Sequence, residues 1–313
     1  MRQFVKLTLV FSLLLLVITV LLIEVPEYFL EKRADFKLTQ NPKHIIIGHS
    51  HSECSFNDTL IQDLANLSGS GESYFYTYFK TKYVLEQNPS IETVFIEFTN
   101  NQVSPIMDEW TWDDEHMNHR YPKYAPFMNM KEKTLLASNN FKGFITSNSF
   151  SAKDNMGRIV SKNYTYINES PISKPPSDPR TLDSLITDAK KQGKIKEDTL
   201  LSAVNVEYLR KIVKLCREKG KQVVLIRSPL HTSYRGYANE SLYQAIRKKY
   251  FSSLAFMDFS KVKLDNSNFY DLEHLNEKGA RAFSVWFDNF LKEGTDLSSM
   301  DTTYFDLSLE TNL

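Results

Sequence analysis

The sequence has no surplus of either charge and very little cysteine: 38 basic residues are balanced by 38 acidic ones, and its 313 residues include two cysteines. It contains no basic block and no stripe of interleaved basic and aromatic residues, so nucleic acid is not an expected partner. Cys54 and Cys216 lie far apart, and Cys216 falls on the apolar side of an expected helix. A disulfide between the two cysteines is the alternative outside the membrane, but we expect a buried free thiol at Cys216 and no cysteine chemistry.

The N-terminus carries a long hydrophobic run, Leu7–Ile23, with no charged residue inside it. Its length is at the short end of the ~17–25 residues that a membrane-spanning helix needs. Arg2 and Lys6 precede the run and Glu24 and Glu27 follow it, so we expect a cytoplasmic N-terminus and an extracytoplasmic remainder. A cleaved signal peptide is the alternative. The run exceeds the usual apolar segment of ~7–15 residues and no small-x-small cleavage site follows, which favours an uncleaved anchor over residues 1–30.

Beyond the anchor, strand and helix patterns alternate. Short apolar runs rich in β-branched residues predict strands at 43–48, 65–67, 93–98, 222–227 and 254–259. Apolar residues at helical spacing predict helices at 73–87, 200–219, 240–250 and from about 276, and Asn57 or Asp58 is expected to cap a short helix. The alternation predicts an α/β fold over residues 43–292, a doubly wound, flavodoxin-like parallel sheet with helices on both faces.

The stretch 104–198 interrupts this alternation with aromatic residues and the turn-rich segment SPISKPPSDPR. An interruption of roughly 95 residues is too long for an idle loop. It predicts a cap or lid over the strand ends, with a peripheral subdomain that only packs as the alternative. After Gly294 the chain has acidic residues but no Lys or Arg, so residues 293–313 are expected to form a loosely ordered polar tail.

Two polar segments at opposite ends of the α/β region carry the candidate chemistry. The first strand leads into GHSHSECSFND, where Gly48 permits a tight turn and Ser50 lies at the mouth of the strand. Near the other end, Asp271 and His274 are three residues apart just before the last helix. That spacing lets a carboxylate hold an imidazole while the other ring nitrogen faces a serine. We therefore predict Ser50 as nucleophile, His274 as base and Asp271 as the orienting acid.

These two segments, GHSHSECSF and DLEHLNEKGA, resemble the first and last sequence blocks of the SGNH (GDSL-like) hydrolases. They are most similar to the membrane-anchored branch, which includes the D-alanyl transfer protein of lipoteichoic acid synthesis and alginate-type O-acetyltransferases. The resemblance covers residues 43–103 and 199–292. It departs from the family at His49, where Asp is usual, and in lacking G-x-N-D. It implies oxyanion donors after the second and third strands, and the matching positions are Gly69 or Gly71 and Asn100 or Asn101.

Other polar side chains have both functional and structural interpretations. His51 and His231 follow strand exits, so they are candidates for substrate contact or for hydrogen bonding within loops. In DDEHMNH (113–119), His116 and His119 have a spacing that can ligate a metal, and Asp113 with His116 repeats the D-x-x-H pattern. No second ligand pair supports a metal, so we expect neither a metal nor a cofactor.

The sequence therefore predicts a membrane-anchored serine esterase or O-acyltransferase that acts outside the cytoplasm on an ester of a cell-envelope glycan or lipid, through an acyl-Ser50 intermediate. Its expected partners are the membrane, through the N-terminal helix, an acyl-ester or glycan substrate and envelope-assembly proteins. One alternative is an inactive SGNH-like accessory or binding protein in envelope assembly, because fold alone does not define function. Another is a metal-dependent hydrolase that uses His49, His51 and the histidines of the insertion.

Overall fold

The computed structural model describes residues 1–167, 174, 178–192, 197–293 and 303–304. The chain divides into two compact units. Unit 1 comprises Met1–Phe36 and Thr111–Tyr166, and unit 2 comprises Lys37–Trp110 and Ile167–Leu313. The predicted insertion is thus shared between the units, and its role as a lid stays a prediction. Most of the SPISKPPSDPR segment and of the polar tail lies outside the described residues.

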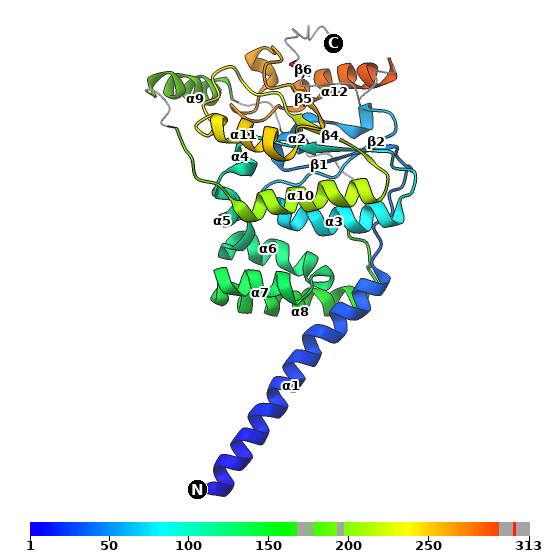
Figure 1. The fold of residues 1–313 in the computed structure, drawn as a ribbon, viewed down its shortest axis with the longest axis vertical. Helices are drawn as coiled ribbons and strands as arrows, with labels where there is room; N and C mark the ends of the chain where they lie inside the picture. The colour runs from blue at the N-terminus through cyan, green and yellow to red at the C-terminus, as the bar shows by residue number, and fades with distance from the viewer. Residues whose placement is uncertain (168–173, 175–177, 193–196, 294–302, 305–313) are drawn as a thin grey trace. The chain divides into compact units, whose positions relative to one another are not determined.

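Unit 2 is built on a parallel sheet (Figure 1). The five main strands are β1 (His44–Ile47), β2 (Leu64–Asn66), β3 (Thr93–Glu97), β4 (Gln222–Arg227) and β5 (Ala255–Asp258). They are arranged in the order β2-β1-β3-β4-β5, and the two-residue strand β6 (Thr303–Tyr304) pairs in parallel with β5. This order is the flavodoxin-like one, so the predicted fold class is confirmed.

Helices cover both faces of this sheet, as Figure 1 shows for α3 and α10 on one side and α12 on the other. The helices of unit 2 are α2 (Ser50–Ser55), α3 (Tyr74–Gln87), α4 (Asn100–Val103), α9 (Pro179–Lys191), α10 (Ala203–Glu218), α11 (Glu240–Tyr250) and α12 (Glu277–Lys292), while α5 (Ile106–Trp112) spans the boundary between the units. The core under α12 joins Phe283 and Phe287 to strand residues such as Phe95. Each such buried side chain stabilises the fold by ~1.5–3 kcal/mol.

The first turn after β1 differs from the sequence-based prediction. The helix expected after Asn57 is only a 3₁₀ turn, Asp58–Leu60, although Asn57 caps it as expected by accepting the Thr59 N–H at 3.1 Å. The α-helix begins earlier, at Ser50 itself. Its residues SHSECS have no apolar stripe at helical spacing, so the periodicity on which the prediction rests does not reveal it.

Both cysteines are buried and free, as predicted for Cys216. Burial raises the pKa of each thiol to about 12. The thiolate is the reactive form of cysteine, so neither residue is a candidate nucleophile.

Unit 1 is helical. It contains α1 (Arg2–Arg33), α6 (Asp114–Tyr124), the 3₁₀ turn Ala125–Phe127, α7 (Met130–Asn139) and α8 (Phe141–Ser161). In the part of the chain that the structure describes, α1 is the one helix long and apolar enough to cross a membrane, with a mean hydropathy of 2.8 in its most apolar window. Lys133 of α7 joins it by ion pairs to Glu24 at 2.8 Å and to Glu27 at 2.6 Å.

Candidate active site

The candidate site lies at the carboxyl end of β1. In the sheet, β2 is the neighbour of β1 on one side and β3 is its neighbour on the other. The carboxyl end of β1 is therefore the topological switch point, where doubly wound sheets bind ligands. The turn between β1 and α2 requires a glycine at position 48, because the side chain of Glu97, at the end of β3, approaches it closely. A Cβ on Gly48 would lie 2.3 Å from Glu97 Oε2 and 2.4 Å from Glu97 Cβ. The turn therefore brings Ser50 to the first position of α2.

Ser50, His274 and Asp271 form a continuous chain of hydrogen bonds. Ser50 Oγ lies 2.8 Å from His274 Nε2, and His274 Nδ1 lies 2.9 Å from each carboxylate oxygen of Asp271. The side chains of His274 and Asp271 are 17% and 29% exposed, so solvent or a small ligand can reach the pair. The three residues predicted from sequence are therefore brought together in the geometry that a serine nucleophile, its base and an orienting acid require.

Asp271 is held by its own loop as well as by the imidazole. Its Oδ1 accepts the backbone N–H groups of Glu273 at 2.7 Å and His274 at 2.8 Å. Burial acts to raise the pKa of Asp271, but the hydrogen bond and charge of His274 and these N–H groups outweigh it and hold the pKa below its usual value. The carboxylate is therefore charged at neutral pH, which keeps the proton of the neutral imidazole on Nδ1 and leaves Nε2 free to accept from Ser50.

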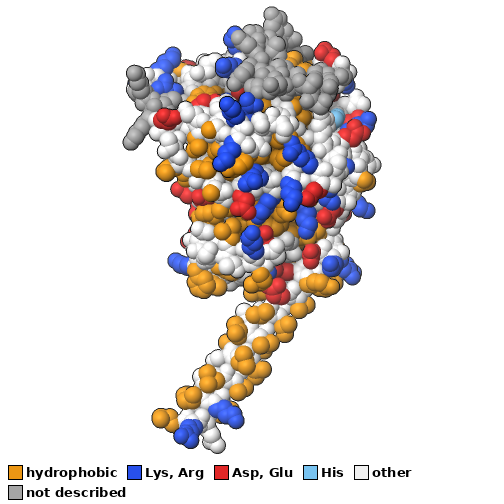
Figure 2. All heavy atoms as spheres, in the orientation of Figure 1, with side chains coloured by type: hydrophobic (Ala, Val, Ile, Leu, Met, Phe, Trp, Pro, Cys, Tyr) orange, Lys and Arg blue, Asp and Glu red, His pale blue; other side chains and the backbone are white. Residues whose placement is uncertain are grey.

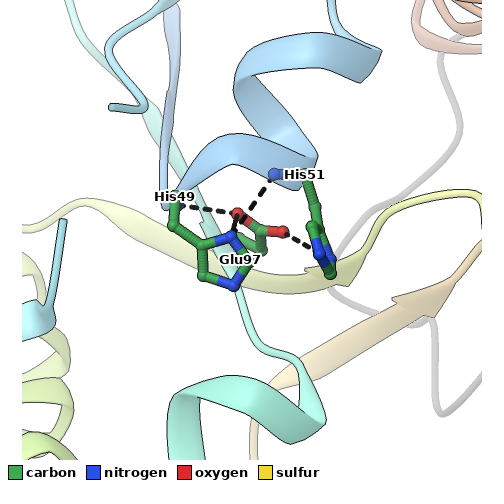
Figure 3. A group of neighbouring side chains, drawn as sticks. All are labelled: His49, His51 and Glu97. Atoms are coloured by element: carbon green, nitrogen blue, oxygen red, sulfur yellow. Dashed lines mark hydrogen bonds and ion pairs between the residues drawn. The ribbon is translucent and has the colours of Figure 1, made fainter. Parts of the chain in front are cut away.

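A buried cluster beneath Ser50, formed by His49, His51 and Glu97, supports the start of α2 (Figure 3). His49 is the N-cap of α2 and donates its backbone N–H to Glu97 Oε2 at 2.8 Å. Its ring accepts the His51 N–H at Nδ1 (3.3 Å) and contacts Thr99 Oγ1 through Nε2 (3.2 Å). Burial, followed by the nearby His51 and His274, lowers the pKa of His49 well below its usual value. The ring is therefore neutral and serves as a hydrogen-bonding cap.

The same cluster has the residue types of a metal site. Its candidate ligand atoms lie within 4.8 Å of one another, and among the described residues no other group of three meets this criterion, so His116 and His119 are not part of one. The lone pair of His49 Nδ1 is already used, because this nitrogen accepts the His51 N–H, and Glu97 Oε2 accepts the His49 N–H with one of its lone pairs. The cluster therefore fits a hydrogen-bonded support for α2 better than a metal site.

His51 connects this cluster to the triad. Its Nε2 lies 3.0 Å from Glu273 Oε2 and its Nδ1 lies 3.7 Å from Glu97 Oε1. The ring also stands edge-to-face against His274, with 5.1 Å between centroids. Glu273 accepts from His51, which is the main reason why its pKa lies below the usual value. His51 therefore lies between two carboxylates beside His274, and the sequence-based prediction identified neither Glu97 nor Glu273 as its partner.

The four candidate oxyanion donors differ in their surroundings. The Gly69 N–H donates to Gly48 O at 3.1 Å and is occupied, and Gly71 has φ 65° in the same loop. Asn100 is buried and its amide donates to Asn239 at 3.1 Å and to Glu240 at 2.8 Å, away from the triad residues. Asn101 instead lies beside the triad loop, with its amide 3.4 Å from Glu273 Oε2. A bond of that length is weak, so Asn101 is the better-placed side-chain donor of the two asparagines.

His231 is engaged at both ring nitrogens. Its Nδ1 accepts the Ser233 N–H at 3.0 Å and its Nε2 lies 3.0 Å from Asn266 Oδ1. Its backbone N–H also donates to Leu272 O at 3.1 Å. These bonds fix the exit of β4 to the segment that carries Asp271. They support the structural interpretation of His231, whose side chain also lines a cavity at the carboxyl ends of β4 and β5.

The other D-x-x-H copy has the same local geometry. Asp113 caps α6, and the two Asp113 oxygens each lie 2.9 Å from His116 Nδ1. The copy belongs to unit 1, whereas Ser50 belongs to unit 2. The D-x-x-H motif by itself therefore produces an imidazole held by an aspartate. What distinguishes the copy at residues 271–274 is the contact of His274 Nε2 with Ser50 Oγ.

Fold and site together define an α/β protein with a hydrogen-bonded serine, histidine and aspartate at the sheet's switch point. A protein-family model whose description names no activity matches residues 135–295, about half of the chain, and the chain belongs to the family that it defines. No curated protein matches the sequence.

Two solved structures are similar in part. One is a Streptococcus pneumonia protein named as a candidate platelet activating factor, with 11% identity and a TM-score of 0.38, covering 90% of this chain and 97% of its own. The other is a candidate acylhydrolase from Bacteroides fragilis, with 11% identity and a TM-score of 0.36, covering 85% and 93%. At these levels of similarity, the interpretation of the site rests on its own geometry.

Proposed function

We propose that this protein is a membrane-anchored serine esterase or O-acyltransferase that works through an acyl-Ser50 intermediate. The observation that supports this most directly is the 2.8 Å contact from Ser50 Oγ to His274 Nε2, continued at 2.9 Å to Asp271. A serine hydroxyl is a weak nucleophile until a neighbouring base removes its proton. Here the base and its orienting carboxylate are both in hydrogen-bonding reach.

The reaction follows from these contacts. Ser50 Oγ attacks the carbonyl carbon of an ester while His274 Nε2 takes the hydroxyl proton, and Asp271 stabilises the imidazolium. Collapse of the tetrahedral intermediate breaks the ester C–O bond, and His274 returns the proton to the leaving alcohol. Water or a second hydroxyl then attacks the acyl-serine with His274 again as the base. Hydrolysis and transfer differ only in this last acceptor.

The developing oxyanion requires donors beside Ser50. Asn101 is our candidate side chain, because its amide lies next to Glu273 in the triad loop and is only weakly engaged there. One well-placed donor is worth ~3–4 kcal/mol of transition-state stabilisation. Replacement of Asn101 should therefore reduce turnover far more than replacement of Asn100, which is bonded elsewhere.

A cavity of about 570 Å³ at the carboxyl ends of β4 and β5 offers room for an acceptor. Its buried Arg227 pairs with the equally enclosed Asp258 at 3.1 Å and with Glu240 at 3.2 Å. The charged and hydroxyl-bearing side chains of this lining can hydrogen-bond the hydroxyl groups of a ligand such as a glycan. We place α1 as an uncleaved anchor with its N-terminus in the cytoplasm, on the charge asymmetry around the apolar run.

The test is to trap the intermediate. The full-length protein in detergent is mixed with an aryl acetate and quenched in acid, and the acetylated peptide is located by mass spectrometry. We expect acetyl on Ser50 and none in the Ser50→Ala variant, whereas Ser52→Ala, on the same helix, retains it. A correctly folded wild type that is never acylated would favour the alternative of an accessory protein without turnover.

A further inference from the structure

Unit 1 contains an apolar groove between α1, α7 and α8. Its volume is about 530 Å³, within the ~300–1,000 Å³ of ordinary ligand sites. The walls come from Thr19, Val20, Leu22, Ile23 and Glu24 of α1, from Met130, Lys133, Thr134 and Ala137 of α7, and from Phe144, Ile145, Asn148, Ser149 and Ala152 of α8. We propose that this groove binds the acyl chain of a bilayer lipid.

The charges at the groove argue for an uncharged occupant. Lys133, its one basic lining residue, is 2.8 Å from Glu24 and 2.6 Å from Glu27. The lysine is thus already paired with two carboxylates, so an anionic headgroup has no cation left to pair with. The remaining walls are mainly aliphatic and aromatic carbon. An alkyl chain gains ~0.8 kcal/mol for each CH₂ group removed from water.

The level of the groove along α1 identifies the source of that chain. The uncharged run Leu7–Ile23 is about 25 Å long at ~1.5 Å per residue, against a hydrocarbon core of ~30 Å. The α1 residues of the groove from Thr19 to Ile23 belong to the last part of this run and Glu24 follows it, so the groove opens where α1 leaves the hydrocarbon. A span shorter than the hydrocarbon core is accommodated by local thinning of the bilayer or by snorkelling of the residues that flank the span. The groove is therefore at the depth of the lipid chains if α1 is the anchor that we propose.

An exposed apolar stripe on α8 continues from the groove. Phe141, Ile145, Met156 and Val160 are 69%, 52%, 46% and 78% exposed, and their spacing places them within a ~100° sector of the helix. Figure 2 shows apolar side chains along α1 and on the helices at its C-terminal end. In water such a stripe would be left unburied, but on a membrane it contacts the lipid boundary as an interfacial helix does. The stripe and groove together form one lipid-facing surface of unit 1.

The experiment uses full-length protein in nanodiscs that contain a trace of phosphatidylcholine with a photoreactive diazirine on its acyl chain. After irradiation, adducts are mapped by peptide mass spectrometry. We expect adducts on α1 and also on α7 and α8 between Met130 and Ala152. Ala152→Trp, which fills the groove, and Ile145→Asp, at a half-exposed position that should not disturb folding, are each expected to reduce the α7 and α8 adducts more than about fivefold. Phe150→Asp, on α8 outside the groove lining, should leave them unchanged.

The outcomes separate this inference from the proposed anchor. Adducts on α1 alone would overturn the lipid site while leaving the anchor intact, and adducts on neither would contradict both. Loss of the α7 and α8 lipid adducts at a protein-to-nanodisc ratio that places two chains in one disc would assign the groove to a second chain and overturn the proposal. Labelling by a headgroup-linked diazirine but not by the acyl-linked one would equally contradict an acyl-chain occupant.

Discussion

Replacing Asp271 with asparagine is expected to inactivate the site without disturbing its shape. In the wild type, Asp271 Oδ1 accepts the N–H groups of Glu273 and His274, and His274 Nδ1 lies 2.9 Å from both carboxylate oxygens. The asparagine oxygen must stay at the Oδ1 position to satisfy those two N–H donors. Its NH₂ group then faces His274 Nδ1, which has to become an acceptor.

The consequence is the wrong tautomer of the base. The ring proton of His274 moves to Nε2, where it faces Ser50 Oγ at 2.8 Å and cannot accept the serine proton. In serine triads this change lowers turnover by ~10⁴-fold, or about 5 kcal/mol in the barrier. We therefore expect the rate of Ser50 acylation to fall by about 10³–10⁴-fold in Asp271→Asn.

The assay is the acylation rate with an aryl acetate, accompanied by ¹⁵N chemical shifts of the His274 ring, which report the tautomer directly. Asp113→Asn is the matched control, because Asp113 holds His116 in the same local geometry within unit 1. It should leave the rate unchanged. A folded Asp271→Asn variant that acylates within about threefold of wild type would refute this account of the triad.

Three further predictions concern the support beneath Ser50. Gly48→Ala should destabilise the fold by ~1–3 kcal/mol in chemical denaturation, because the new Cβ meets Glu97. Gly157→Ala is the control, because no atom lies within 4 Å of the new Cβ, and it should not destabilise the fold. Burial raises the pKa of Glu97 in the folded protein above its unfolded pKa of 4.5. Its contribution to stability is therefore complete below the unfolded pKa and is lost as the pH rises through the folded pKa. The melting temperature of Glu97→Gln relative to wild type should rise with pH, and a difference that does not depend on pH would contradict this. Removal of metals with a chelator should leave acylation and melting unchanged, and loss of either, restored by one metal, would show that the His49 cluster binds an ion after all.

The strands of the sheet could be predicted from sequence because each one is marked by its own short apolar run. Runs such as QVVLIR (222–227) are apolar on both faces, which is typical of a parallel strand covered on both sides. The helix α2 could not be predicted in this way, because its start is stabilised by a contact from a residue of β3. Glu97 accepts the His49 N–H at the start of that helix from 48 residues away.

The supporting residues of the candidate site show the same limit. Glu97 had one signal in the sequence, a single charge at the end of an otherwise apolar strand, and Glu273 had its place between Asp271 and His274. Neither signal specifies that His51 lies between the two carboxylates. The grouping of Thr111–Tyr166 with the N-terminal helix also depends on distant pairs, such as Lys133 with Glu24 and Glu27, which no local pattern reveals.

The central claim, an activated Ser50, is tested most directly by labelling full-length protein in detergent with a fluorophosphonate probe. The account predicts that wild type and His116→Ala are labelled on Ser50, and that Ser50→Ala and His274→Ala are not. Absence of labelling in a folded wild type, or labelling that survives in His274→Ala at the wild-type rate, would contradict it.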